Sequence, residues 1–280
     1  MTIAYLDAAE VQRRLTPAAA VDALGAALRS GLQPDDDPPR SAIDVPGGQL
    51  LVMPSAAAPR PVVKLVTVGG DPRVQGLCVA FGETSLAPEA VVDGIAVTNL
   101  RTAAVSGLAV RHLAVPDATR LLVFGRGPQA HAHVAAMQAV RPIEQVDMLG
   151  RDADERDDLV AAADVICCCT TAREPLFDGG LVAGHATVVA IGSHERDARE
   201  VDDTLVARAT VIVESTGSAL REAGDVIQAI SSGALDPQHL VELAELVRGE
   251  REPALGAPRL FKSTGMAWED AVTVNAILSG

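Results

Sequence analysis

Three basic side chains interrupt stretches that are otherwise apolar or acidic. Lys64 stands alone in the apolar run 61–68, Arg101 separates two apolar runs, and Arg40 ends the acidic, proline-rich stretch 33–40. Any one of them could be a stem lying along apolar surface with its charge in water, or half of an ion pair. Together, three cations in one apolar region predict a pocket for a substrate carboxylate, with arginine supplying a bidentate fork.

A glycine turn is the second candidate for chemistry. In LLVFGRGPQAHAHV, the pattern Gly125-x-Gly127-x-x-Ala130 follows an apolar strand-like run and opens a helix-like one. Pro128 suits the first helical position, where its missing N–H costs nothing, and the N–H groups of a first helical turn favour phosphate. The pattern predicts the pyrophosphate turn of a dinucleotide site. The alternative is a tight strand-to-helix turn that binds no ligand.

The end of the next strand indicates the coenzyme. An Asp or Glu there, about 20 residues after the glycines, binds the ribose hydroxyls of NAD, whereas an Arg suits the 2′-phosphate of NADP. In this chain Gly150 takes the place of the acid and Arg151 follows it. This favours NADP over NAD, although Arg151 could simply be solvated and Asp152 could cap the next helix.

Composition limits the class of protein. Of the 280 residues, 48% are hydrophobic and 2% aromatic, so the core must be built from Val, Ala and Leu, as in buried parallel strands. A net charge of −14 argues against nucleic acid and membrane surfaces as partners. The cysteines, three of them consecutive at 167–169, lack metal-ligand spacing and are expected in a core strand. No signal peptide or transmembrane-length segment is recognisable, so a reduced cytoplasmic protein without metal is expected.

Two patterns of apolar and turn-forming residues divide the chain into two regions. Between residues 41 and 97, β-branched runs separated by Gly and Pro predict a largely antiparallel sheet. From residue 121, apolar strands alternate with helical segments, which predicts a doubly wound parallel sheet. We therefore expect an α/β protein in which residues 1–115 with 258–280 form an α+β substrate domain and residues 116–257 a nucleotide domain. Residues 236–250 are expected to form an acidic amphipathic helix with a solvated face.

Five stretches resemble, in the same order, motifs of the ornithine cyclodeaminase/mu-crystallin family. They are DGIAVTNLRTAAVSGLAVRHLA, LLVFGRGPQAHAHV, ADVICCCTT, VVAIGSHERDAREVDDTLVARA and RLFKSTGMAWEDA. The resemblance extends from about Arg40 to the end of the chain. It implies a homodimer whose first domain joins the subunits and holds the substrate, and a Rossmann domain that holds NAD(P).

The resemblance also implies roles for individual residues. Arg40, Lys64 and Arg101 match positions that hold the substrate carboxylate, in agreement with the independent interpretation of these cations. Thr264 matches a residue near the substrate. With Arg151 from the ribose argument, the candidate nucleotide-binding residues are Arg101, Thr102, Gly125, Gly127, Pro128, Gln129, Ala130, Arg151, Thr170, Ile191 and Ser263.

One departure from the family bears on the reaction. Where its cyclodeaminases carry an Asp after the fourth strand of the nucleotide domain, this chain has His194. The resemblance with this departure implies an NAD(P)-dependent imine reductase or amino-acid dehydrogenase, with hydride passing between the nicotinamide and the C=N or C–N carbon of a 2-imino or amino acid. Lys64 and His194 are the candidate proton carriers, although a structural histidine is equally compatible with the sequence.

Two alternatives remain open at this point. Ornithine cyclodeamination would take and return the same hydride, so NAD would be recycled. A nucleotide-binding protein without turnover, as mu-crystallins can be, would use the glycine turn alone. Both catalytic interpretations require the nicotinamide to face the three cations.

Overall fold

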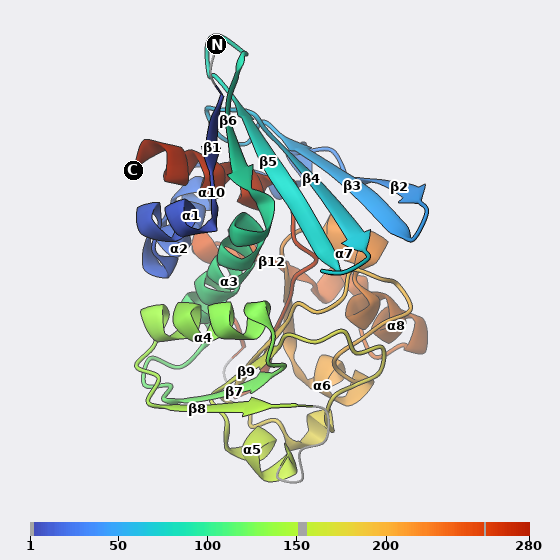
Figure 1. Ribbon diagram of the computed structural model, residues 1–280. Coiled ribbons are helices and arrows are strands. Elements are labelled where there is room, and N and C mark those ends of the chain that lie inside the picture. Colours follow the sequence, from blue (N-terminus) through green and yellow to red (C-terminus); the bar gives the residue numbers. More distant parts are fainter. Residues whose placement is uncertain (1–2, 151–155, 255) are drawn as a thin grey trace. The chain divides into compact units, whose positions relative to one another are not determined.

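The protein folds into two compact units. The computed structural model describes residues 3–150, 156–254 and 256–280. One unit comprises Met1–Val105 with Met266–Gly280, and the other comprises Ser106–Gly265 (Figure 1). The division therefore falls after residue 105, inside a helix, whereas the sequence analysis placed it after residue 115.

A six-stranded sheet forms the first unit, in the order β1-β6-β5-β4-β3-β2. β1 pairs with β6 in parallel and the other pairs are antiparallel, which agrees with the predicted, largely antiparallel sheet. The strands are β1 (Ala4–Leu6), β2 (Ser41–Val45), β3 (Gly48–Ser55), β4 (Val62–Gly69), β5 (Val74–Phe81) and β6 (Pro88–Asp93). The helices are α1 (Ala8–Arg14), α2 (Pro17–Arg29), the first part of α3 (Gly94–Leu113) and α10 (Ala267–Ser279).

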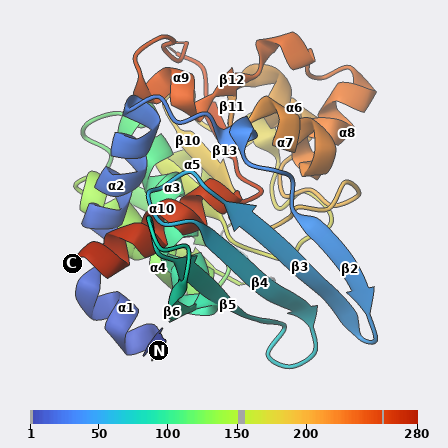
Figure 2. The same ribbon diagram turned by 90° about the horizontal axis from the view of Figure 1, so that it is seen from above.

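The two faces of this sheet differ because side chains alternate along each strand. On β3 and β4, one set that includes Met53, Lys64 and Val66 is buried, while most of the alternate set is half-exposed. Helix α10 packs on β3, β4 and β5, and α2 packs against α10, as Figure 2 shows. The face that carries Lys64 is therefore the one covered by α10.

Helix α3 begins where β6 ends. Asp93 Oδ1 accepts hydrogen bonds from the backbone N–H groups of Ile95 (2.9 Å) and Ala96 (2.8 Å), which is how an acidic residue caps a helix N-terminus. A side chain at Gly94 would meet the backbone of Gly76 at 2.6 Å, so the strand-to-helix corner requires glycine. The turns that follow carry Arg101, which this corner positions.

A seven-stranded parallel sheet forms the second unit, in the order β12-β11-β13-β10-β9-β7-β8. This confirms the predicted doubly wound sheet. The strands are β7 (Arg120–Phe124), β8 (Gln145–Leu149), β9 (Val165–Cys168), β10 (Thr187–Ala190), β11 (Thr210–Val213), β12 (Val241–Glu242) and β13 (Arg259–Lys262). The helices are α4 (Pro128–Val140), α5 (Arg156–Ala162), α6 (Asp203–Arg208), α7 (Thr216–Glu222), α8 (Gly224–Ser232) and α9 (Leu243–Val247).

Two segments of the second unit differ from expectation. β13 lies between β10 and β11, so residues 259–262 belong to the parallel sheet and only α10 returns to the first unit. All four residues of β13 are buried, which its central place in the sheet explains. Residues 236–250 do not form one amphipathic helix, because β12 pairs with β11 as an edge strand and leaves only the short α9 after it.

The core of the second unit is aliphatic, as the composition predicts. Cys167 and Cys168 are fully buried in β9, as expected, whereas Cys169 follows the strand and is half-buried. Among the described residues, no helix combines the length and the apolar character needed to cross a lipid bilayer.

Candidate active site

Lys64 and Arg101, two of the three predicted carboxylate-binding cations, meet at one acidic side chain. Asp270 Oδ1 accepts hydrogen bonds from Lys64 Nζ and Arg101 Nε, each over 3.1 Å. Arg101 Nη1 also donates to Glu269 Oε2 over 2.6 Å. The four residues come from β4, α3 and α10 within the first unit, and none of them is more than 5% exposed. The structure thus brings two of the cations together on carboxylates of the C-terminal helix.

Burial shapes the protonation of this cluster. It lowers the pKa of the Lys64 ammonium, and the charge of Asp270 acts in the opposite direction. Cys78 pairs with Lys64 across β4 and β5, and burial raises the pKa of its thiol to about 12. Lys64 is therefore a cation that gives up its proton more readily than an exposed lysine, beside a thiol that stays neutral.

Arg40 lies directly before β2 and is half-buried. Ser41 pairs with Val52, and Met53 pairs with Lys64. Continuing the register by one residue sets Arg40 opposite Met53, in the cross-strand row that contains Lys64. Residues of one row point to the same face of a sheet, so the pairing pattern places the third cation on the row of the first, two strands away.

The glycine turn joins β7 to α4, the setting expected from the sequence. Gly125 has φ of +115°, a conformation that favours glycine, and a Cβ there would lie 2.5 Å from the carbonyl oxygen of Cys169. Gly127 is the N-cap of α4, Pro128 is its first residue, and no side chain caps the helix. A Cβ on Gly127 would meet no atom within 4 Å. Among the described residues, nothing therefore crowds the side of Gly127 on which a side chain would stand.

The end of β8 is the predicted place of coenzyme selection. Gly150 follows the strand directly and is half-buried. The nearest neighbours of a Cβ at this position would be atoms of the Arg126 guanidinium, 3.8 Å away. Arg151, predicted to bind a 2′-phosphate, lies outside the described residues.

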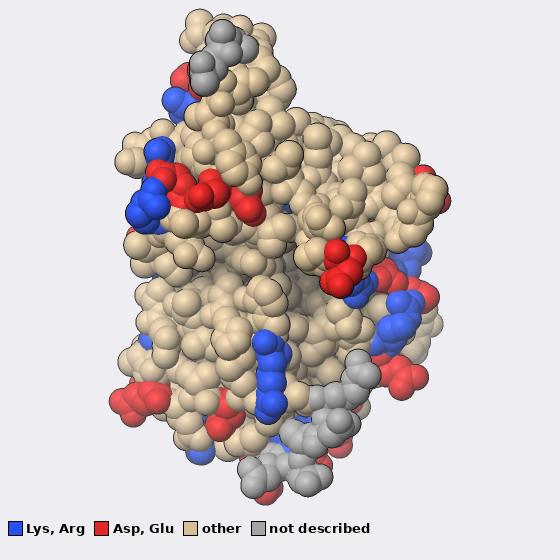
Figure 3. Space-filling view, viewed as in Figure 1, with Lys and Arg blue, Asp and Glu red and all other residues tan. Residues whose placement is uncertain are grey.

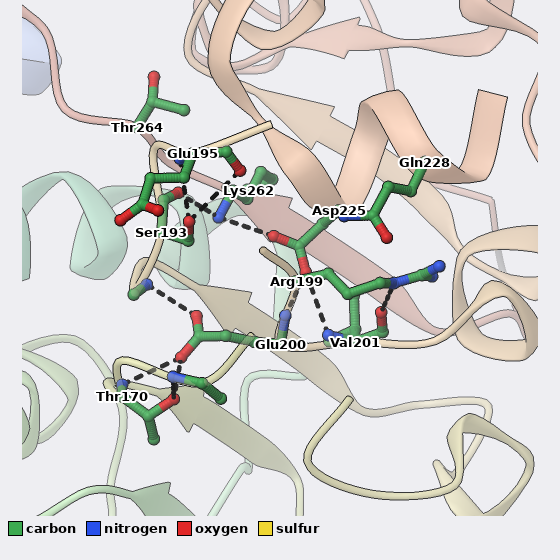
Figure 4. A network of polar contacts seen from close by, with 12 residues as sticks. Thr170, Ser193, Glu195, Arg199, Glu200, Val201, Asp225, Gln228, Lys262 and Thr264 are labelled. Carbon is green, nitrogen blue, oxygen red and sulfur yellow. Dashed lines mark hydrogen bonds and ion pairs between the residues drawn. The ribbon is translucent and has the colours of Figure 1, made fainter. Parts of the chain in front are cut away.

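Glu200 ties together the loops that carry Thr170 and Ile191 (Figure 4). Its Oε1 accepts hydrogen bonds from Thr170 N over 3.0 Å and from Thr170 Oγ1 over 2.7 Å, and its Oε2 accepts one from Gly192 N over 2.7 Å. Thr170 and Ile191 follow the adjacent parallel strands β9 and β10 at their carboxyl ends. Open α/β sheets bind their ligands at this edge, so Glu200 holds two predicted nucleotide-contacting loops in place.

A buried ion pair between Lys262 and Asp225 contacts the backbone of Glu200. Lys262 Nζ lies 2.8 Å from Asp225 Oδ2 and donates to the carbonyl oxygen of Ser193 over 2.8 Å. Asp225 Oδ1 accepts from the backbone N–H groups of Glu200 (2.6 Å) and Val201 (3.1 Å). Burial raises the pKa of the Glu200 carboxyl to about 7, against the charge of Lys262. This carboxyl therefore titrates near neutral pH.

Ser263 and Thr264 follow β13 and are fixed by Glu214. Ser263 Oγ donates to Glu214 Oε1 over 2.6 Å, and the N–H groups of Thr264 and Gly265 donate to Oε2 over 2.9 and 3.0 Å. A further hydrogen bond of 2.9 Å joins Thr264 Oγ1 and Ser218 Oγ. The Ser263 hydroxyl is thus committed to Glu214, and the turn is held rigidly.

His194 lies in the loop after β10 and is half-buried. It follows Ser193, whose carbonyl oxygen accepts from Lys262. His194 and Thr264 belong to the second unit, whereas Arg101 and Thr102, both buried on α3, belong to the first. The catalytic role of His194 stays a prediction.

The sequence interpretation missed the buried carboxylates that hold these residues: Glu200, Glu214, Glu269 and Asp270. A carboxylate is rarely buried unless it is paired. Glu214 directly follows the run TVIV, and Glu269 and Asp270 are the only charged residues of the segment AWEDAVTVNAIL. Acidic residues within apolar stretches were therefore the available signal.

Replacing Glu200 with glutamine is expected to remove one component of the pH dependence of stability. The folded-state pKa of about 7 lies above the ordinary value of 4.5, so the folded protein keeps this proton while the unfolded chain loses it. The stabilisation is fully present below pH 4.5 and is lost as the pH rises through 7, with a slope of at most about 1.4 kcal/mol per pH unit. Urea unfolding across this range measures the difference between wild type and Glu200→Gln.

The exposed Glu83 provides a matched control. Glu83→Gln should leave the pH profile of the unfolding free energy unchanged. If wild type and Glu200→Gln differ by the same free energy at every pH in the range, Glu200 does not titrate near neutrality.

Named reductases resemble this chain in sequence, and a solved structure resembles it in fold. The model of the ornithine cyclodeaminase/mu-crystallin family matches residues 2–159 and 151–279. Delta(1)-pyrroline-2-carboxylate reductase of Colwellia psychrerythraea is 35% identical over 68% of each chain. Ketimine reductase mu-crystallin of Rattus norvegicus is 32% identical over 98% of this chain and 96% of the rat protein.

A solved structure agrees over nearly the whole length. Thermococcus litoralis Delta(1)-pyrroline-2-carboxylate reductase, in complex with NADH and L-proline, superposes with a TM-score of 0.92 at 26% identity, covering 99% of this chain and 97% of that chain. The family predicted from the sequence motifs is thereby confirmed. The chain belongs to the ornithine cyclodeaminase/mu-crystallin family.

Proposed function

We propose that the protein is an NAD(P)H-dependent reductase of 2-imino carboxylates, with cyclic ketimines such as Δ1-pyrroline-2-carboxylate as its substrate class. The two relatives described above are named as reductases of this kind. The observation that carries the proposal is the buried meeting of Lys64 and Arg101 on Asp270. It offers cations for a carboxylate and a proton for an imine nitrogen within one cluster.

The second unit fits a nicotinamide dinucleotide. The open space beside Gly127 and the uncapped N-terminus of α4 suit a pyrophosphate, whose charge a helix N-terminus favours. When bound, the reduced nicotinamide supplies the hydride. We assign the coenzyme to Gly125, Gly127, Pro128, Gln129, Ala130, Thr170, Ile191 and Ser263, the last through its backbone; Arg101, Thr102 and Arg151 remain predictions from the sequence.

The first unit suits the carboxylate of the substrate. Arg40, Lys64 and Arg101 carry three positive charges, and Glu269 and Asp270 carry two negative ones, so these five side chains sum to +1. The single negative charge of a monocarboxylate would neutralise this +1. An arginine binds a carboxylate with two parallel hydrogen bonds. Glu269 and Asp270 orient the cations rather than bind substrate. Thr264 of the second unit is assigned to the substrate by resemblance alone.

The imine nitrogen must gain a proton when its carbon gains hydride. Lys64 is the first candidate, because burial lowers the pKa of its ammonium, while the charge of Asp270 acts in the opposite direction. A group whose pKa lies near the working pH transfers protons most effectively. His194 is the second candidate, since an imidazole can both donate and accept a proton.

A homodimer through the first sheet completes the proposal. On the face away from α10, Tyr5, Ile43 and Leu77 are 61%, 50% and 41% exposed, and Leu77 pairs with the half-buried Leu65. Figure 3 shows this face as a broad surface with few charged side chains. Exposed apolar side chains that gather on one face of a sheet favour an interface.

We also propose a cytoplasmic location. The four cysteines are free, which suits the reducing cytoplasm.

The activity is tested by following reduced nicotinamide with Δ1-pyrroline- or Δ1-piperideine-2-carboxylate. We expect stoichiometric consumption of the reduced coenzyme and formation of the cyclic amino acid. Δ1-Pyrroline, which lacks the carboxylate, is the matched control and should react at least about 100-fold less efficiently, because it forfeits the charge-assisted contacts. Ammonia and proline formed from ornithine with catalytic NAD would instead establish the cyclodeaminase, and coenzyme binding without turnover would establish a binding protein.

A further inference from the structure

Arg126 reaches from the glycine turn to the end of the neighbouring strand. It stands between Gly125 and Gly127 after β7, and β7 pairs in parallel with β8. A Cβ built on Gly150 would lie 3.8 Å from both Nε and Cζ of Arg126 and 4.0 Å from its Nη1. The guanidinium therefore lies beside Gly150, the residue that follows β8.

Among the described residues, this guanidinium has few partners. Arg126 is exposed, and its Nη2 donates to the carbonyl oxygen of Met148 over 3.4 Å, near the upper limit for a hydrogen bond. Within the part of the chain that the structure describes, none of the ion pairs includes Arg126. In a chain of net charge −14, a guanidinium with these surroundings keeps its donors for another anion.

The position of the Arg126 guanidinium indicates which anion it can bind. In dinucleotide-binding folds, an acid at the end of the second strand binds the ribose 2′-hydroxyl, and an arginine near that place accommodates a 2′-phosphate. Gly150 provides no acid and leaves room, and the Arg126 fork lies at the edge of that room. A guanidinium matches phosphate geometry with two parallel hydrogen bonds.

We propose that Arg126 and Gly150 form the binding site for the 2′-phosphate of NADPH, and that Arg126 determines the choice of coenzyme. This inference rests on the proposed function, because it requires a nucleotide in the glycine turn. It goes further by naming the coenzyme and the residue that selects it. The sequence alone predicted Arg151 for this role. Arg126 instead belongs to the glycine turn.

Calorimetric titration of the whole chain tests this without turnover. The ligands are NADPH, NADH, and the fragments 2′,5′-ADP and 5′-ADP, which lack the nicotinamide. Arg126→Gln is expected to weaken NADPH and 2′,5′-ADP about 10- to 100-fold, as for the loss of a charged hydrogen-bonding partner. NADH and 5′-ADP should change by less than about threefold. Arg126→Lys, which keeps the charge and loses the fork, should weaken NADPH by a smaller factor.

Two further variants sharpen the test. Gly150→Asp places a carboxylate beside the guanidinium without a clash, because the nearest contact of its Cβ is at ordinary van der Waals distance. It should weaken NADPH and leave NADH binding intact. Arg120 lies at the opposite end of β7 and is exposed, so Arg120→Gln is the matched control and should change neither coenzyme.

The outcomes separate the inference from the proposed function. Equal losses of NADPH and NADH in Arg126→Gln would mean that the guanidinium stacks on the adenine, and would overturn the inference. A selective loss of NADPH in Arg151→Gln with none in Arg126→Gln would also overturn it. Tight NADH binding with no preference for 2′,5′-ADP over 5′-ADP in wild type removes the phosphate site alone. Binding of neither coenzyme removes the proposed function itself.

Discussion

Lysine in place of Arg101 is expected to lower kcat/KM for a 2-imino carboxylate by about 100-fold or more, while coenzyme binding stays measurable. Arg101 contacts Asp270 through Nε and Glu269 through Nη1. A single ammonium cannot bridge both carboxylates and also present a fork to the substrate. Asp270 then loses a donor, and Lys64 loses part of what orients it. Steady-state kinetics at saturating coenzyme and a coenzyme titration measure the two effects separately.

Arg60→Lys is the matched control in the same unit. The Arg60 Nε to Glu89 Oε2 pair, at 3.1 Å, has side chains that are 31% and 45% exposed, and exposed pairs contribute little. Arg101→Met has a different use: it leaves two buried carboxylates with one cation, and should lower the free energy of unfolding by about 3–5 kcal/mol. Folded Arg101→Lys with nearly wild-type kcat/KM would exclude Arg101 from the substrate site.

Alanine at the two glycines of the turn should separate folding from coenzyme binding. Gly127→Ala is expected to weaken NADPH and NADH about 10-fold or more, because its methyl group fills the space assigned to the pyrophosphate, whose contacts are charge-assisted. Its unfolding free energy should change by no more than about 0.5 kcal/mol, since φ is −84° and no atom lies within 4 Å of the new Cβ. Calorimetry and urea unfolding provide the two measurements.

Gly125→Ala should lose both coenzyme affinity and stability. Its φ of +115° and the 2.5 Å approach of the Cys169 carbonyl oxygen make a side chain strained there, which we expect to cost at least about 1–3 kcal/mol of stability. Unchanged coenzyme binding in Gly127→Ala would show that the pyrophosphate does not approach this turn. Unchanged stability in Gly125→Ala would contradict the left-handed backbone conformation.

Local patterns predicted the features that depend on neighbouring residues. Most strands of both sheets are visible as β-branched or apolar runs, although β1, β2 and β12 were not predicted as strands. The glycine turn is visible because Gly125, Gly127 and Pro128 each have a local conformational reason. Lys64 and Arg101 stood out because a charge in an apolar run needs a partner. The sequence could therefore identify the cations before the structure showed what holds them.

The partners of those cations depend on tertiary packing and could not be predicted in the same way. Asp270 is 206 residues from Lys64 along the chain and 169 from Arg101. A repeating pattern of residue types cannot reveal a contact between residues so far apart in the sequence. Strand β13 was assigned to the wrong unit for a related reason, because its sequence shows a buried strand but not the sheet that accepts it. Residues 236–250 have helical amphipathicity, yet pairing with β11 outweighs helix propensity at Val241 and Glu242.

The path of the last residues bears on biosynthesis. Arg259–Lys262 fills a gap in the middle of one sheet, and Ala267–Ser279 covers the face of the other. Domains of a growing polypeptide generally fold in order as they leave the ribosome, but here neither unit can be completed until this final segment has emerged. Nascent chains should therefore stay sensitive to protease until residues 259–279 have emerged, and then become resistant in a single step.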